Sequence, residues 1–258
     1  MQKNIVFVHG MFQNPKSWKH WIDFFTHRGY NCIAPAWPDH DGEPAELRLH
    51  PPATLGELKL EDILNRIEDI IATLPEKPIV IGHSVGGLIT QLLANKDLIR
   101  LGVPVSSVAP NAMLAFDWNF FKNSMTIANP FKGNQPMLTD AEAFYASFCN
   151  TLSVPAAREA FEQTATHDSR NVLRDCMLAP GHLDLDRPHV PLLFVTGDQD
   201  RIIPYELVDK NAHAYTDQLS RTEYRLFMGR SHYICGEPGW EEVAEYVYEW
   251  LERHIALG

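Results

Sequence analysis

Short buried strands alternate with amphipathic helices in this chain, and this alternation is the feature that most limits its fold. Continuous apolar or β-branched runs predict strands at 5–8, 30–36, 79–81, 103–108, 192–196 and 221–227. Helical spacing of apolar residues predicts helices over 17–29, 58–74, 205–214 and 240–255, and a further helix that follows residue 84 and extends to 93. Strands that alternate with helices form a parallel sheet with helices on both faces. The expected fold class is therefore α/β, with a mostly parallel sheet flanked by helices.

The regular alternation lapses in the middle of the chain. Residues 111–185 contain no strand-like run, but they are rich in aromatic side chains: Phe116, Trp118, Phe120, Phe121, Phe131, Phe144, Tyr145 and Phe148. This composition indicates a helical insertion, so we expect a core formed by 1–110 and 186–258 and a helical cap formed by 111–185. The polar, proline-rich stretch 39–54 is expected to be a surface loop.

Charge and cysteine usage limit the partners and the compartment. The net charge is −11, and an acidic surface repels phosphate backbones and anionic headgroups, so we expect neither nucleic-acid nor stable membrane-surface binding. No apolar run approaches the roughly 20 residues of a membrane span, and the first apolar run (5–8) is too short for a signal-peptide core. The four cysteines form no C-x-x-C pair. We expect a cytoplasmic protein, either a monomer or a homodimer.

A glycine-flanked serine follows the third predicted strand directly. The segment Gly82-His83-Ser84-Val85-Gly86 matches G-x-S-x-G and lies between a strand and a helix. This kind of turn lifts the hydroxyl above the sheet on a strained backbone, and small residues two positions before and after the serine avoid clashes. The N–H of Val85 then lies at a helix N-terminus, free to bind an oxyanion. Ser84 is the candidate nucleophile and Val85 a candidate oxyanion donor, with a plain glycine-rich turn as the alternative.

A second candidate oxyanion donor follows the first predicted strand. In His9-Gly10-Met11-Phe12, the glycine allows the chain to turn sharply across the top of the sheet, so that the N–H of Met11 could face the same site. The alternative is an ordinary strand-to-helix turn whose hydrophobic residue packs downward.

An acid and a base are predicted on two later loops. Asp198 and Asp200 both follow the strand at 192–196; Asp200 is favoured to orient a histidine, and Asp198 to bond backbone N–H groups in the turn. Of the twelve histidines, His232 is the one that follows a strand directly after Asp200. His213 and His254 lie in helices and are expected to be solvated. The chain order Ser84, Asp200, His232 is the order found in α/β-hydrolases.

The motifs together carry a family resemblance. With H-G, G-H-S-V-G-G, G-D-Q-D-R-I-I-P and G-R-S-H in register, the chain resembles the α/β-hydrolase superfamily over nearly its whole length. The resemblance implies Ser84 as nucleophile, Asp200 as acid, His232 as base, and the N–H groups of Met11 and Val85 as the oxyanion hole. The antiparallel strands that usually precede the first strand are absent, which suggests a sheet of about six strands. Relatives with an aspartate nucleophile are disfavoured, because Ser84 occupies that position.

The expected activity is hydrolysis of a small, moderately hydrophobic carboxylic ester or lactone through an acyl-enzyme. Phe12, Trp37 and Trp118 are the candidate substrate contacts. Metal-ligand residue types occur at 39–41 and 182–186, but without a partner cluster of suitable spacing, so we expect neither a metal nor a cofactor. Alternatives are a carbon–carbon bond hydrolase, a perhydrolase or a cofactor-independent oxygenase of the same fold, and a ligand receptor that retains the triad.

Overall fold

The protein, represented by a computed structural model that describes residues 3–114 and 127–256, is built on one parallel sheet. Its six strands are β1 (Lys3–Val8), β2 (Tyr30–Ile33), β3 (Ile79–His83), β4 (Leu101–Val105), β5 (Leu192–Gly197) and β6 (Thr222–Phe227). The spatial order is β2-β1-β3-β4-β5-β6, and every neighbouring pair is parallel. The predicted parallel α/β sheet is thus confirmed. The strand boundaries differ from the predicted ranges by up to three residues; the largest differences are that β2 ends three residues early and that β4 lies two to three residues before the predicted 103–108.

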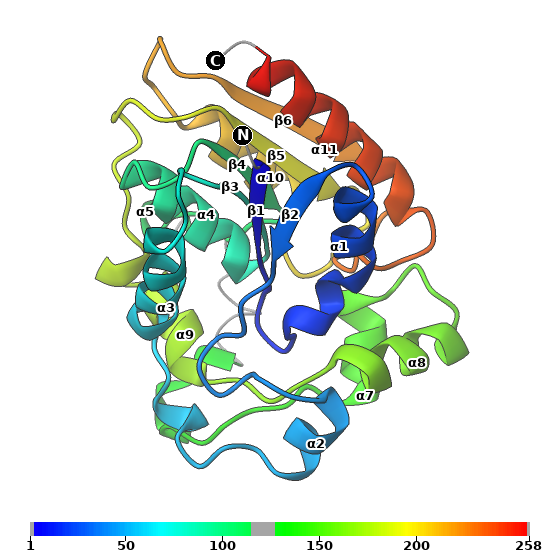
Figure 1. Ribbon diagram of the computed structural model, residues 1–258. Coiled ribbons are helices and arrows are strands. Elements are labelled where there is room, and N and C mark those ends of the chain that lie inside the picture. The colour runs from blue at the N-terminus through cyan, green and yellow to red at the C-terminus, as the bar shows by residue number, and fades with distance from the viewer. Residues whose placement is uncertain (1–2, 115–126, 257–258) are drawn as a thin grey trace.

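Helices cover both faces of the sheet (Figure 1). One face carries α1 (Lys19–Thr26), which follows a 3₁₀ turn at Pro15–Trp18, and α11 (Trp240–Ile255). The other face carries α3 (Leu60–Ala72), α4 (Val85–Asn95) and α10 (Tyr205–His213). Helix α3 shows why this layer forms: its buried residues recur every three or four positions, at Leu60, Ile63, Leu64, Ile67 and Ile71.

A layer of short helices lies beyond the carboxyl ends of the strands (Figure 1). Within the predicted cap the structure describes α5 (Asn111–Leu114), α7 (Ala141–Ala143), a π-helical turn (Phe144–Phe148), α8 (Val154–Thr164), α9 (Arg170–Cys176) and 3₁₀ turns at Pro130–Lys132 and Ala179–Gly181. Part of this layer has a small core of its own, formed by Phe144, Phe148, Cys149, Ala157, Ala160, Phe161 and Ala165. The layer therefore covers the carboxyl ends of the strands, where parallel sheets usually carry their functional residues.

The prediction of a loop over 39–54 is wrong, because this segment contains helix α2 (Pro44–Leu49), followed by a 3₁₀ turn at Leu55–Glu57. Pro44 occupies the first turn of α2, where its missing N–H costs nothing. The helix packs on α8, and the guanidinium of Arg48 donates to the carbonyl oxygens of Phe161 (3.3 Å) and Ala165 (2.8 Å). A segment expected to lie over the surface therefore extends the cap layer.

Candidate active site

Ser84 lies at the sharp turn between β3 and α4, and it is the single residue that separates them. Its backbone has φ 57° and ψ −117°, a strained conformation for a residue with a side chain, and its N–H donates to the carbonyl oxygen of Val105 at 2.9 Å. Only glycine fits at the flanking positions. A Cβ added to Gly82 would lie 2.0 Å from the carbonyl oxygen of Gly86, and one added to Gly86 would lie 2.2 Å from that of Val8.

Asp200 and His232 form a buried hydrogen-bonded pair at the neighbouring strand ends. The carboxylate oxygen Oδ2 of Asp200 accepts from Nδ1 of His232 at 2.7 Å, and both side chains are almost inaccessible to solvent. The other oxygen, Oδ1, accepts from the backbone N–H groups of Ile202 (2.9 Å) and Ile203 (2.8 Å). With its Nδ1 proton held by the carboxylate, His232 has Nε2 free to exchange a proton with a group in the adjoining cavity.

The three residues weighed against this pair, Asp198, His213 and His254, have other environments. Asp198 accepts a hydrogen bond from the backbone N–H of Gly229, which links the turns after β5 and β6. His213 is exposed on α10 as expected. The expectation that His254 is solvated is wrong, because its ring packs on Trp250 with the ring centroids 4.3 Å apart and its side chain is only 7% exposed.

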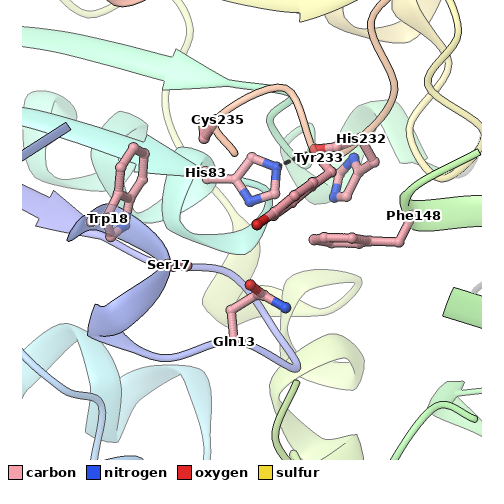
Figure 2. Close-up of a pocket in the computed structure, with 8 residues that line it drawn as sticks. All are labelled: Gln13, Ser17, Trp18, His83, Phe148, His232, Tyr233 and Cys235. Atoms are coloured by element: carbon pink, nitrogen blue, oxygen red, sulfur yellow. Dashed lines mark hydrogen bonds between the residues drawn. The ribbon is translucent and has the colours of Figure 1, made fainter. Parts of the chain in front are cut away.

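His83 supports His232 from inside the nucleophile turn. Its Nε2–H donates to the backbone carbonyl oxygen of His232 at 2.8 Å, and the two ring centroids are 4.6 Å apart (Figure 2). Burial and the neighbouring His232 lower the pKa of His83 well below its usual value, so the ring is neutral. His83, Tyr233 and His232 lie close together (Figure 2). They line a small cavity of about 10 Å³, which has space for about one water molecule. The backbone position of His232 is therefore fixed by a neutral donor.

Glu237 stabilises the loop that carries His232 through hydrogen bonds. Its carboxylate is buried and accepts from the N–H (2.9 Å) and the hydroxyl (3.1 Å) of Ser231, and from the hydroxyl of Thr151. Sequence analysis missed both His83 and Glu237. The signal for His83 was its place inside the motif, whereas Glu237 lies in an unremarkable stretch and is identified only by its contacts.

Ser84 and His232 line a common cavity of about 410 Å³, together with both predicted oxyanion donors, Met11 and Val85. Val85 belongs to the first turn of α4, where backbone N–H groups have no acceptor within the helix. The loop that carries Met11 approaches Ser84 closely, since a Cβ added to Gly10 would lie 2.7 Å from Cβ of Ser84. The two donor candidates therefore border Ser84 from different loops.

The cavity has the size of a small-molecule site and a mainly apolar lining. The sheet side supplies Phe12, Val108, Ile202, Ile203 and Arg201, whereas the cap layer supplies Ile127, Met137, Thr139, Ala143, Phe144, Ser147, Phe148 and Leu173. The π-helical turn after α7 thus contributes three lining residues, which agrees with the frequent occurrence of such turns at functional sites.

The three predicted substrate contacts have different positions. Phe12 lines the cavity. Trp37 does not: it is 1% exposed and its ring stacks on His9 with the centroids 4.4 Å apart, so it is corrected to a core residue. Trp118 falls outside the described residues.

In the described parts of the chain, no group of three or more His, Cys, Asp or Glu side chains could hold a metal ion. The metal-type residues singled out at 39–41 and 182–186 have other partners: His40 faces Asp168, and Asp186 accepts from the hydroxyl of Thr216. Within residues 3–114 and 127–256, no helix has the length and apolar character needed to cross a bilayer.

Comparison with known proteins identifies the family. A model of the alpha/beta hydrolase family matches residues 5–246. The search of curated proteins returned no match. The similar solved structures include a monoacylglycerol lipase from Paleococcus ferrophilus, with 22% identity, a TM-score of 0.72, and coverage of 97% of this chain and 94% of that one. They also include polyneuridine aldehyde esterase (15% identity, TM-score 0.69, coverage 96% and 99%) and tomato methylketone synthase I (15%, 0.72, 98% and 99%). The parallel sheet and the match of the family model over residues 5–246 show that the chain belongs to the alpha/beta hydrolase family.

Proposed function

We propose that this protein is a serine hydrolase that cleaves the carboxylic ester, or the lactone, of a small and moderately hydrophobic compound. The observation that carries the proposal is the Asp200–His232 hydrogen bond beside Ser84 in one apolar cavity. A carboxylate bonded to Nδ1 keeps Nε2 of an imidazole available as a base, which is the arrangement that activates a serine hydroxyl.

The proposed reaction has two halves. Ser84 Oγ attacks the ester carbonyl carbon while Nε2 of His232 accepts the hydroxyl proton, and the resulting oxyanion is stabilised by the N–H groups of Met11 and Val85. The intermediate collapses to an acyl-enzyme, and the leaving alcohol takes the proton from His232. Water then attacks the acyl carbonyl and loses its proton to His232. When this second intermediate collapses, His232 returns the proton to Ser84 Oγ and the acid is released.

The cavity supports the proposed substrate class. Twelve of its seventeen lining residues are apolar, and the volume of about 410 Å³ suits a small molecule rather than a folded protein. Arg201 is the one cation among these lining residues; its guanidinium donates to the carbonyl oxygen of Ala146 at 3.1 Å and is partly exposed. An uncharged acyl chain therefore matches the lining better than a phosphorylated metabolite or a peptide.

The test is hydrolysis of p-nitrophenyl esters of increasing acyl length by the native protein and by Ser84→Ala. We expect turnover in the native protein, a loss of about 10⁴-fold or more in the variant, and a chain-length optimum set by the cavity. Labelling by a fluorophosphonate should reach one equivalent per chain and disappear in Ser84→Ala. Equal rates in the two proteins, or no turnover of any ester, would refute the esterase proposal and direct attention to carbon–carbon substrates or to a receptor role.

A further inference from the structure

Asp168 contacts the loop after β1 from a position in the predicted cap, 156 residues further along the chain. Its carboxylate is 0% exposed, and Oδ2 accepts from the backbone N–H of Phe12 at 2.9 Å. The other oxygen, Oδ1, accepts from the N–H of Ser169 at 2.7 Å. Burial of a carboxylate is costly unless it is paired, so its partners indicate what it is there to hold.

The third partner of the Asp168 carboxylate is a buried histidine, His40. Nε2 of His40 lies 3.3 Å from Oδ2, and both side chains are inaccessible. The contact is an ion pair without the alignment of a hydrogen bond, whereas Nδ1–H of His40 donates to the carbonyl oxygen of Pro38 at 2.9 Å. Burial by itself lowers the pKa of His40, but the carboxylates of Asp168 and Asp39 outweigh it and the pKa is raised. His40 is therefore the buried side chain that faces the carboxylate of Asp168.

The loop that Asp168 contacts is strained at Phe12. This residue has φ 62°, in the left-handed region that a residue with a side chain rarely adopts. Its carbonyl oxygen accepts from the N–H of Thr166 at 3.0 Å, so both backbone polar groups of Phe12 are bonded by the segment 166–168. The hydroxyl of Thr166 also donates to the carbonyl oxygen of Gln13 at 3.2 Å. Strain of this kind persists only where several contacts impose it.

The position of Phe12 determines the orientation of the preceding residue. The N–H that Asp168 binds belongs to the peptide group between Met11 and Phe12, so the bond fixes the plane of that group. The backbone N–H groups of Met11 and Phe12 follow one another along the chain. Asp168 accepts from that of Phe12, so that of Met11 remains available to a ligand in the cavity that Met11 lines with Ser84. The segment 166–168 is anchored in turn by paired backbone bonds between Asp168 and Met137, at 2.8 and 2.9 Å.

We infer that Asp168, with the ring of His40 packed against its carboxylate, is a positioning residue that holds the strained Phe12 turn and thereby aims the N–H of Met11 at the reacting carbonyl. The inference rests on the proposed function, because an oxyanion donor matters only if an acyl group is attacked at Ser84. It assigns to the cap layer a direct part in transition-state stabilisation, in addition to lining the cavity.

The test is Asp168→Asn, which preserves shape but not charge. An amide cannot accept from both Phe12 and Ser169, because its NH₂ must face one of these two N–H donors. We expect kcat to fall about 10²-fold, as for a misplacement of about 1 Å, with little change in KM. Inhibition by a trifluoromethyl ketone, which forms a tetrahedral oxyanion on the serine, should weaken by the same factor as kcat/KM.

The matched control is Arg48→Met. Arg48 also joins the two layers through backbone carbonyl oxygens, those of Phe161 and Ala165, but it does not line the cavity. This variant should lose thermal stability and keep its kcat and its affinity for the trifluoromethyl ketone. If Asp168→Asn does not fold, His40→Gln provides the test, since it retains the carboxylate and removes the imidazole that faces it at 3.3 Å. The same selective loss of kcat is expected, smaller in size.

The outcomes separate the two proposals. Ester turnover that survives Ser84→Ala refutes the proposed function itself. If Ser84 is essential but the folded Asp168→Asn, or His40→Gln in its place, keeps kcat and inhibitor affinity, the positioning role is wrong. The same conclusion follows if the variant behaves as Arg48→Met does and loses stability alone, or if KM rises while kcat is unchanged.

Discussion

Replacement of Asp200 by Asn provides a sharp test of how the base is oriented, because the structure determines which way the new amide must point. Oδ1 of Asp200 accepts from two backbone N–H groups, those of Ile202 and Ile203. In Asp200→Asn the amide oxygen has to occupy that position, since the NH₂ group would otherwise face two donors. The NH₂ group then faces Nδ1 of His232, 2.7 Å away in the native protein. His232 must accept there, so its proton moves to Nε2.

A histidine with its proton on Nε2 cannot take the proton of Ser84. We therefore expect kcat to fall by about 10⁴-fold, as is typical when the wrong tautomer is imposed, which corresponds to about 5.4 kcal/mol of transition-state stabilisation. Stability should change little, because the two bonds to the backbone are retained. The assay is the steady-state rate and the burst of p-nitrophenol release, with the rate of fluorophosphonate labelling measured in parallel.

The control for this experiment is Asp198→Asn, a change of the same kind two residues earlier. Asp198 bonds the N–H of Gly229 and does not contact His232, so this variant should keep a rate of the native order. A loss of less than tenfold in Asp200→Asn, or equal losses in the two variants, would refute the assignment of Asp200 as the residue that orients the base.

Two further predictions concern packing and protonation. Gly86→Ala would bring a Cβ to 2.2 Å from the carbonyl oxygen of Val8. We expect the free energy of unfolding to decrease by about 1–3 kcal/mol or more, and the melting temperature to decrease by about 2–4 °C per kcal/mol. An unchanged melting temperature by circular dichroism would contradict this prediction. Burial lowers the pKa of His9 and His83, so below about pH 6.5 the unfolded chain binds protons that the native state does not. The free energy of unfolding therefore decreases as the pH decreases. In urea unfolding, the free energy of unfolding of His83→Gln should decrease less between about pH 7.5 and 5.5 than that of the native protein. An equal decrease in both proteins would mean that His83 is protonated in the folded state.

The sequence predicted the sheet well because its four inner strands, β1, β3, β4 and β5, are buried on both faces. Continuous apolar runs such as Ile79-Val80-Ile81 are typical of parallel strands that are covered by helices on both faces. Boundaries were less predictable, because they depend on partners: β2 ends at Ile33, the residue that pairs with Val6 of β1, and residues 34–36 have no ladder partner there. Helix α2 was missed although Pro44 is a recognisable helix-start signal, since the polar composition around it favoured a loop.

The candidate site was predictable where it follows local rules and not where it depends on docking. Ser84, Asp200 and His232 each follow a strand, so their order along the chain was sufficient to select them. Asp168 has no such signal, because its role arises from a contact with Phe12 that exists only once the cap layer is in place. Trp37 was chosen for its ring alone, and nothing in the sequence showed that this ring would stack on His9.

The strand order has a consequence for how the chain is synthesised. The first four strands to emerge, β1 to β4, can pair at once, but β4 lies beside β5, which begins 87 residues after β4 ends. At roughly 5–20 residues per second, the ribosome needs roughly 4–17 s to make the chain between them. Throughout that interval β4 presents an unpaired and strongly apolar edge, the kind of surface that recruits foreign strands. The nascent chain is therefore most prone to aggregate while the cap is being translated, and fragments that end before β5 should be the least soluble.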